Sequence, residues 1–207
     1  MVKAIYIRMP RCGSTSLVSF CQTKKVKYFG GWDMGLWCRE IGWRRNSGLF
    51  RSSKSTSKFL YKCVLNHVGE KAYKENFTFS SVRNPYSRAV SMYKHPSWKS
   101  VKTFKQFCGS IKKNLYPSEA AEWHTSSLTE HLVDKDTLKV DFVIKLENFQ
   151  QDFNMVCDKI GIPHTKLPHK NRSNHKPYTQ YYDDETRQIV SEKYARDIEY
   201  FGYEFGA

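Results

Sequence analysis

The sequence predicts an α/β fold, a three-layer sandwich in which helices flank a central, mostly parallel sheet. Three short apolar segments alternate with stretches whose apolar residues recur at helical spacing, which is the pattern of parallel strands joined by crossover helices. The chain has 207 residues and no internal repeat or linker, and a chain of this length can bury about 70% of its unfolded surface. We therefore expect a single domain over residues 1–207.

The first expected elements are a strand, a tight loop and a helix. Residues 2–9, VKAIYIRM, are rich in β-branched and aromatic side chains and predict a buried strand. From Ser14 onward Leu17, Val18 and Cys21 recur at helical spacing. Residues 23–58 hold glycine clusters, several tryptophans and the run RSSKSTSK. We expect an irregular region there, which either holds substrate or is a solvated loop.

The next strand and helix are predicted at residues 77–93. FTFSSVR, residues 77–83, has the composition of a second strand. Asn84 suits the position that caps a helix, and Pro85 suits the first helical position. The apolar face of this helix holds Ala89, Val90 and Tyr93.

The carboxyl half contains a third strand and two helices by the same criteria. Residues 140–146, VDFVIKL, predict the strand. The helix after it ends at Gly161, and its apolar stripe holds Phe149, Phe153, Val156, Cys157 and Ile160. One last helix is expected from near Asp183 to Gly202; its apolar face holds Ile189, Val190, Tyr194 and Ile198.

The net charge indicates anionic partners. Lysine and arginine number 34 against 20 acidic residues, which gives +14. A phosphorylated cofactor, a nucleic acid, a polyanionic glycan and a membrane surface all fit this charge, and the charge alone does not choose among them.

The six cysteines are scattered and include no C-x-x-C pair, which disfavours a structural zinc site. The sequence begins at Met1 without a basic and then apolar leader, and it has no run of about 18 apolar residues. We therefore expect a reduced, cytoplasmic protein without a membrane anchor.

The stretch between the first strand and the first helix is built to bind an anion. The amino terminus of a helix presents unpaired N–H groups and the positive end of its dipole. Gly13 lets an anion approach the backbone, and Arg11 adds a permanent cation. Hydroxyl donors follow at Ser14, Thr15 and Ser16. The fold is P-loop-like in this sense, although an ordinary strand-to-helix turn is the plain alternative.

The segment VRNPYSRAVSMY repeats this arrangement. The second strand ends in Arg83, a helix opens at Asn84, and Ser91 lies about two turns along it. Two strand ends that carry arginines into helix amino termini suggest a ligand with two separated anionic groups.

These residues resemble a known family. MPRCGSTSL followed by FSSVRNPYSRAVSMY is similar to the two cofactor-binding motifs of sulfotransferases that use 3′-phosphoadenosine 5′-phosphosulfate (PAPS). The residues after 140 resemble the carbohydrate-type branch, sulfotransferase family 2-like, in which a segment such as NRSNHKPY closes over the nucleotide. The resemblance implies transfer of a sulfuryl group to a hydroxyl, with 3′-phosphoadenosine 5′-phosphate (PAP) as product.

The resemblance also implies a set of cofactor-binding residues. The first motif would hold the 5′-phosphosulfate, the arginine and serine of the second would hold the 3′-phosphate, and three later residues would contact the nucleotide. In this sequence they are Arg11, Cys12, Gly13, Ser14, Thr15 and Ser16, then Arg83 and Ser91, then Arg172, Lys176 and Tyr178.

Catalysis is expected to need no metal. A sulfuryl group carries less charge than a phosphoryl group, so basic side chains and helix N–H groups can stabilise its transfer. Arg11 stands where the family usually carries a lysine; arginine keeps the charge but cannot donate a proton at neutral pH, so we expect Arg11 to act electrostatically. His67 is predicted to be the base for the acceptor hydroxyl; the alternative is that His67 is a helix-terminal histidine bonded to backbone, with no part in catalysis. His124 is the second candidate, and Asp33 and Glu40 follow.

Two other functions were weighed. A P-loop nucleotide kinase would need a glycine where Arg8 stands and a lysine where Ser14 stands. A non-catalytic, basic nucleic-acid-binding protein fits the charge, but the sheet-face motif of RNA readers is absent from the sequence. The sequence leaves the acceptor open among sugar, tyrosine, lipid and small alcohol, and an anionic glycan would suit the basic charge.

Overall fold

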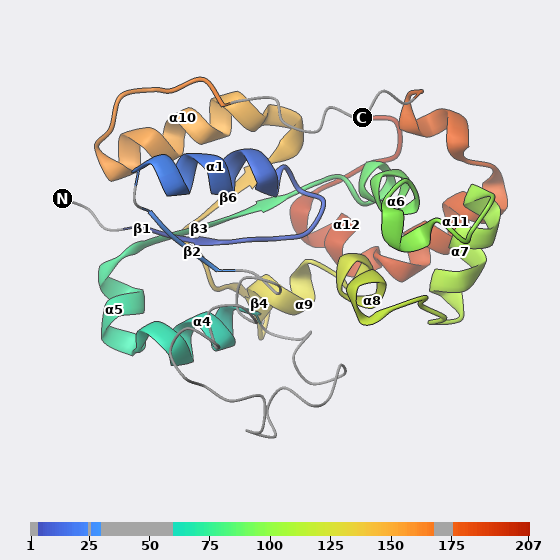
Figure 1. Cartoon of the computed structure of the whole chain (residues 1–207), viewed down its shortest axis with the longest axis horizontal. Coiled ribbons are helices and arrows are strands. Elements are labelled where there is room, and N and C mark those ends of the chain that lie inside the picture. The colour runs from blue at the N-terminus through green and yellow to red at the C-terminus, as the bar shows by residue number, and fades with distance from the viewer. Residues whose placement is uncertain (1–3, 25, 30–59, 168–175) are drawn as a thin grey trace. The chain divides into compact units, whose positions relative to one another are not determined.

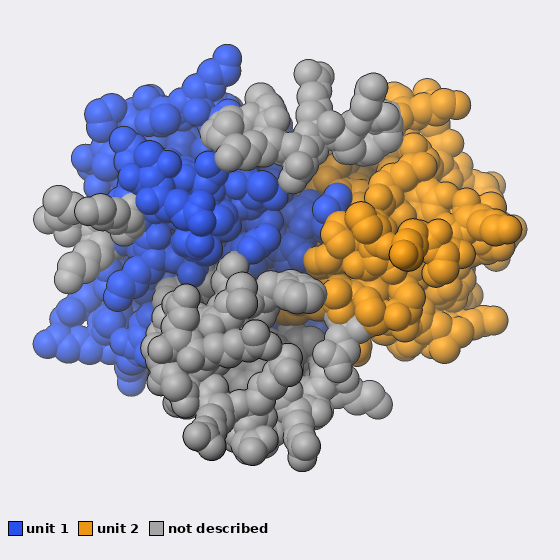
Figure 2. Space-filling model, viewed as in Figure 1, with its two compact units in different colours: residues 1–82, 130–170 blue, residues 83–129, 171–207 orange. Residues whose placement is uncertain are grey.

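The computed structural model describes residues 4–24, 26–29, 60–167 and 176–207. The chain forms two compact units, coloured separately in Figure 2. Unit 1 contains residues 1–82 and 130–170, and unit 2 contains residues 83–129 and 171–207. The boundary between residues 82 and 83 falls before the last residue of the second predicted strand, residues 77–83.

Unit 1 contains a four-stranded parallel sheet, which confirms the predicted fold class. Its strands are β1 (Ala4–Ile7), β2 (Lys27–Phe29), β3 (Phe77–Val82) and β6 (Phe142–Lys145). The order in the sheet is β2-β1-β3-β6, and each neighbouring pair is parallel. The strands that precede the two motifs, β1 and β3, are therefore adjacent, with Ile7 opposite Ser80.

Helices cover both faces of this sheet (Figure 1). The helices α1 (Ser14–Lys24) and α10 (Phe149–Ile160) lie on one face, and α4 (Leu60–Val68) and α5 (Glu70–Glu75) lie on the other. Between the sheet and the first pair of helices, the core is aromatic and aliphatic, with Tyr6, Leu17, Phe20, Phe79 and Phe153 all buried. The rings of Phe20 and Phe153 meet edge to face at 4.7 Å.

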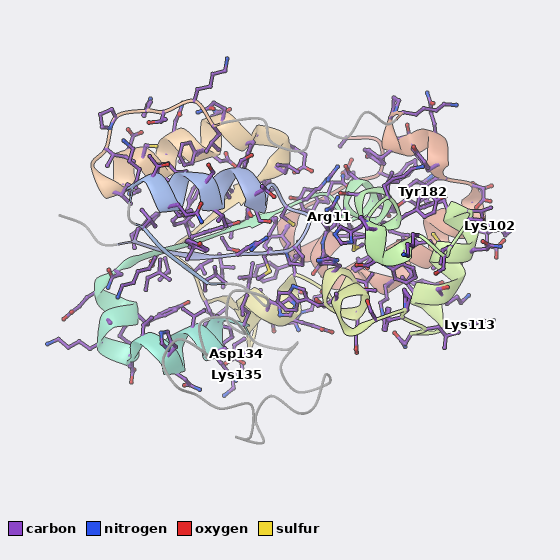
Figure 3. The ribbon with its side chains drawn as sticks, in the orientation of Figure 1. Arg11, Lys102, Lys113, Asp134, Lys135 and Tyr182 are labelled. Atoms are coloured by element: carbon purple, nitrogen blue, oxygen red, sulfur yellow. The ribbon has the colours of Figure 1, made fainter. Side chains whose placement is uncertain are left out.

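The remaining short elements of unit 1 lie around residues 129–148. They are α9 (Thr129–Leu132, which begins at the unit boundary), the antiparallel pair β4 (Val133–Asp134) and β5 (Thr137–Leu138), and η3 (Leu146–Asn148). The Asp134 carboxylate, labelled in Figure 3, accepts a hydrogen bond of 2.5 Å from the hydroxyl of Tyr61 in α4. This bond ties the hairpin to α4 and lowers the pKa of Asp134.

Unit 2 is helical in the described residues and has its own core. Its elements are α6 (Pro85–Tyr93), η2 (Pro96–Trp98), α7 (Phe104–Lys112), α8 (Glu119–Thr125), η4 (Tyr178–Tyr181), α11 (Asp184–Lys193) and α12 (Ala195–Phe201). Trp98 and Phe107 pack edge to face at 4.7 Å, and Val90, Ile111 and Tyr194 belong to the same buried cluster.

A buried charged network also supports unit 2. Arg88 and Asp197 are 1% and 0% exposed, and their charged groups approach to 4.0 Å. The Arg88 guanidinium donates to the His124 carbonyl at 3.0 Å. The Asp197 carboxylate accepts from the hydroxyls of Ser127 and Thr129 and from the backbone N–H groups of residues 128 and 129. Buried charges require such partners because water no longer solvates them.

Most predicted elements are confirmed, and two predictions are wrong. The strand β2 lies inside residues 23–58, where no regular structure was expected; it has only three residues and depends on pairing with β1. The other residues of that region from position 30 onward lie outside the described part.

The single last helix is also wrong, because α11 and α12 are separate helices that meet at Tyr194. This residue has φ −116° and ψ 25°, outside the helical range. Its ring is 1% exposed and its hydroxyl donates to the Thr125 carbonyl at 2.8 Å. The helix is therefore interrupted at a buried tyrosine, although the spacing of the apolar residues is that of one continuous helix. Among the described helices, none combines the length and the hydropathy required to cross a membrane.

Candidate functional site

The first loop, residues 8–13, follows β1 and has an unusual backbone. The φ angle is positive at Arg11 (63°) and at Gly13 (72°), and not at Cys12 between them. Alternation between left- and right-handed conformations turns successive N–H groups toward one side, which makes a concave anion-binding surface. A left-handed arginine costs about 1 kcal/mol or more, and such strain is typical of functional sites.

Gly13 is required for two physical reasons. Its φ of 72° disfavours any residue with a Cβ. A Cβ at this position would also lie 2.8 Å from Leu146 Cδ1 and 2.9 Å from Phe149 Cζ. Gly13 is predicted from the sequence to admit an anion, and in the structure its backbone also packs directly against Leu146 and Phe149, which follow β6.

The helix α1 starts at Ser14, immediately after this glycine. The Gly13 carbonyl accepts the first helical hydrogen bonds, from the N–H groups of Ser16 (3.1 Å) and Leu17 (3.4 Å). No acidic side chain occupies the first turn of α1. Gly13 itself has no side chain with which to cap α1, so the position and the charge of this helix end suit an anion.

The side chains of the first loop and of the start of α1 point to different environments. The Cys12 thiol is fully buried and donates to the Pro10 carbonyl at 3.3 Å. Cys12 would therefore serve a ligand through its backbone N–H. Ser14 and Ser16 are buried, whereas Thr15 is exposed and Arg11, labelled in Figure 3, is partly exposed.

Side chains of β1 and β3 hold these strand ends together. The Ser80 hydroxyl donates to the Ile7 carbonyl at 2.7 Å, and the hydroxyls of Tyr6 and Ser81 are 2.9 Å apart. Burial raises the pKa of Tyr6 far above its ordinary value, so this hydroxyl stays protonated. The first loop therefore begins from a rigid strand end.

The second motif, residues 83–91, follows β3 and uses side chains. Arg83 is the residue directly after Val82, the last residue of β3. Its Nε and Nη2 atoms both donate to the Ser87 hydroxyl, at 3.0 and 2.7 Å. Ser91, one helical turn beyond Ser87, is 3% exposed. Ser87 was not among the predicted site residues, although its spacing of four residues from Arg83 and from Ser91 could have indicated it.

The helix α6 is capped as predicted. Pro85 is its first residue, and the Asn84 side chain accepts a hydrogen bond of 3.0 Å from the N–H of Tyr86. Asn84 is 2% exposed. The cap fixes the backbone directly after Arg83.

The residues expected to close over the nucleotide are only partly described. Arg172 lies outside the described residues. Lys176 is exposed. Tyr178 is half-buried in η4, and its hydroxyl accepts a hydrogen bond of 2.7 Å from the N–H of Gly206. The Tyr178 hydroxyl is thus engaged within unit 2.

The two candidate bases differ in their surroundings. His67 lies in the last turn of α4, where burial first and the charge of Lys27 second lower its pKa. Its imidazole is therefore neutral at pH 7 and able to accept a proton. Lys27 is the first residue of the parallel strand β2, and α4 leads through α5 to the start of β3 (Figure 1), so the charge that acts on His67 and the chain after His67 both belong to the amino ends of strands.

His124, in the last turn of α8, is partly buried and lies edge-on to the ring of His95 at 4.4 Å. The remaining candidates, Asp33 and Glu40, fall outside the described residues. Within residues 4–24, 26–29, 60–167 and 176–207, no three His, Cys, Asp or Glu side chains form a group that could hold a metal ion. The five cysteines in these ranges are free thiols.

The sheet order identifies where a ligand binds in a fold of this kind. From β1 the chain crosses to β2 on one side, and from β3 it continues to β6 on the other, so the order reverses between β1 and β3. Open parallel sheets bind their ligands beyond the carboxyl ends of the strands at such a point. The strands β1 and β3 lead into the two motifs, so this end of the parallel sheet is the candidate anion-binding site of an α/β protein.

Comparison with protein-family models makes the class specific. The model of the sulfotransferase family matches residues 2–204, across both units. The chain belongs to the sulfotransferase family, and sulfotransferase activity in general follows from that membership. Comparisons with curated proteins and with solved structures gave no match.

Proposed function

We propose that this sulfotransferase moves a sulfuryl group from PAPS to a hydroxyl of an anionic carbohydrate and releases PAP. The observation that carries the proposal is the pairing of β1 with β3, because each strand leads directly into one of the two anion-binding motifs. A donor with a phosphosulfate at one end and a 3′-phosphate at the other matches two separate anion sites.

The first loop fits the phosphosulfate end of this donor. PAPS supplies the sulfuryl group and the phosphate that leaves when it is transferred. The backbone N–H groups of residues 11–13 and the start of α1 would bind that phosphate, and Arg11 would add a full positive charge. Arginine does not release a proton at neutral pH, so Arg11 would stabilise the leaving charge without protonating it.

The second motif fits the 3′-phosphate. Arg83 would bind this group as a charged donor, and arginine suits phosphate because its planar fork donates in two parallel directions. Ser87 orients the guanidinium through the two hydrogen bonds described above. Ser91 would add a hydroxyl, and Lys176, Tyr178 and Arg172 would contact the nucleotide.

The base that takes the proton from the acceptor hydroxyl would be His67 or His124. The lowered pKa of His67 keeps its imidazole neutral, as a base requires, whereas its interaction with the charge of Lys27, at the amino end of β2, does not favour it. The variants His67→Gln and His124→Gln separate the two. Loss of the base lowers turnover by about 10²- to 10⁴-fold and leaves the affinity for PAP unchanged.

The anionic acceptor is proposed from the charge of the chain. The sequence has no acidic residue from Asn76 to Ser118, and lysines recur throughout the second half of this stretch. Two lysines of the stretch contact Tyr93. Lys94 Nζ is 4.9 Å from the Tyr93 ring centroid, and the backbone carbonyl of Lys102 accepts a hydrogen bond of 2.8 Å from the Tyr93 hydroxyl. Such a surface attracts polyanions at long range.

Two assays test the proposed function. Calorimetry should show that PAP binds without magnesium and that ATP binds far more weakly. Labelled sulfate from PAPS should then reach a uronate-containing glycan more readily than a neutral glycan or a tyrosine peptide. Magnesium-dependent binding that prefers ATP would overturn the donor, and transfer only to a neutral acceptor or to tyrosine would overturn the anionic carbohydrate. Location in the cytoplasm stays a prediction from the sequence.

A further inference from the structure

The capping residue of the second motif is shared with a segment far away in the sequence. Asn84 Oδ1 accepts from the N–H of Tyr86 at 3.0 Å, while its Nδ2 donates to the Glu204 carbonyl at 2.8 Å. Both bonds are made by one side chain that is 2% exposed. The position of Asn84, and with it the backbone next to Arg83, therefore depends on residues 203–207.

The aromatic ring of Phe205 strengthens this connection. It lies edge-on to Tyr86, in the first turn of α6, at 5.0 Å, and to Tyr182 at 5.3 Å. Tyr182 is labelled in Figure 3, and its hydroxyl donates to the Tyr86 carbonyl at 2.8 Å. The Arg187 guanidinium lies 4.6 Å from the Phe205 ring centroid. Aromatic pairs of this geometry contribute beyond their buried area.

The segment that carries Phe205 is itself tethered. The N–H of Gly206 donates to the Tyr178 hydroxyl at 2.7 Å, and the Tyr203 N–H donates to the Ile198 carbonyl at 2.9 Å. Gly202, with φ 63°, ends α12 and turns the chain. Residues 203–207 are thus held from both sides, so they can hold the start of α6 in turn.

We infer that Phe205 and the Glu204 backbone are positioning elements for Arg83. They would bind no ligand; they would fix Asn84 and Tyr86, whose backbone sets where the Arg83 guanidinium lies. The inference rests on the proposed function, because Arg83 is taken as the group that binds the 3′-phosphate. Small displacements of a binding group are costly, since a shift of 1 Å can lower activity by about a hundredfold.

The test compares two nucleotides that differ in the 3′-phosphate. Calorimetry would give the affinities of PAP and of 5′-AMP, which lacks that group, for the full chain and its variants. Phe205→Ala should weaken PAP binding by about tenfold and leave 5′-AMP binding within about twofold. Phe205→Tyr keeps the ring and should restore PAP binding. Asn84→Ser keeps a good helix cap but loses the donor to Glu204, and it should resemble Phe205→Ala.

Phe201→Ala is the matched control. Phe201 is a buried phenylalanine of the same unit, and its ring lies against Tyr200 at 5.2 Å. This variant should lower the unfolding temperature without changing the ratio of the two affinities. The inference would be overturned if the wild-type chain binds PAP and the ratio of PAP to 5′-AMP affinity is unchanged in both Phe205→Ala and Asn84→Ser. Wild-type chain that fails to prefer PAP over 5′-AMP would instead overturn the proposed function.

Discussion

The two anion-binding motifs follow neighbouring strands but are built in opposite ways. In the first loop the backbone is the expected ligand-binding group: φ alternates in sign, and a glycine without a side chain precedes α1. In the second motif the cap of α6 is already filled by Asn84, and the expected ligand is an arginine side chain pinned by Ser87. The first motif should therefore fail when its backbone is disturbed, and the second when a side chain is removed.

The supports beneath the motifs differ in the same way. The first loop follows the interior strand β1 and packs against the apolar side chains of Leu146 and Phe149. The helix that carries the second motif contains Arg88, whose buried charge is matched by Asp197. Apolar packing tolerates no extra volume, whereas a buried charge tolerates no loss of its partner. Four substitutions test this difference.

The largest effect on stability is expected from Asp197→Ala. It removes the acceptor of four hydrogen bonds and leaves Arg88 buried without its carboxylate. Breaking a buried pair in this way costs about 3–5 kcal/mol, which urea unfolding would measure. Asp183→Ala is the control, because it removes an exposed carboxylate that caps α11 and should cost about 1 kcal/mol. Equal losses in the two variants would show that the buried network adds nothing.

The next largest effect is expected from Gly13→Ala. The new Cβ would approach Leu146 Cδ1 to 2.8 Å, in a backbone conformation with φ 72°. Strain and overpacking together should cost about 2–4 kcal/mol, and the distorted loop should no longer bind PAP measurably by calorimetry.

Gly161→Ala provides a close control for Gly13→Ala. Gly161 has a similar φ of 70°, but a Cβ there would meet nothing within 4 Å. Gly161→Ala should lose only about 1 kcal/mol of stability, because it adds backbone strain and no steric contact. It should bind PAP as the wild type does. If both glycine variants behaved alike, the contact of the first loop with Leu146 and Phe149 would not matter.

Arg83→Ala should affect binding and spare stability. Hydrogen bonds to charged groups contribute about 1.5–3 kcal/mol, so PAP affinity should fall by roughly ten- to a hundredfold. The unfolding temperature should barely change, because Arg83 is only partly buried. Calorimetry with PAP and 5′-AMP would show whether the loss concerns the 3′-phosphate. An equal loss for both nucleotides would assign Arg83 to another part of the ligand.

The sequence predicted features that depend on near neighbours. Asn84 with Pro85, Asp183, and Gly161 each mark a helix end in the sequence, and each of these helix ends is confirmed. The apolar stripe of α10 is likewise local and faces the core. The alternation of strands and helices along the chain was sufficient to predict a parallel sheet.

Features that depend on distant residues were not predictable. The close approach of Gly13 to Leu146 joins residues 133 positions apart in the sequence, and no local pattern encodes it. The break at Tyr194 goes with a hydrogen bond to Thr125, and β2 is a strand because β1 pairs with it. The positive φ of Arg11 runs against the preference of that residue type, so sequence reasoning had no ground to expect it.

The smallest effect is expected from Ser87→Ala. The Ser87 hydroxyl accepts from Arg83 Nε and Nη2 at 3.0 and 2.7 Å, and this pin orients the guanidinium. Its loss should cost about 0.5–1.5 kcal/mol, so PAP affinity should fall by roughly two- to tenfold. Ser110→Ala, which removes a hydroxyl bonded to the Gln106 carbonyl in α7, should leave PAP binding unchanged. In the double variant Arg83→Ala/Ser87→Ala, the serine substitution should add no further loss, because Ser87 acts through Arg83. Additive losses would mean that Ser87 contacts the nucleotide itself, and the second motif would then bind through its helix face as well as through its arginine.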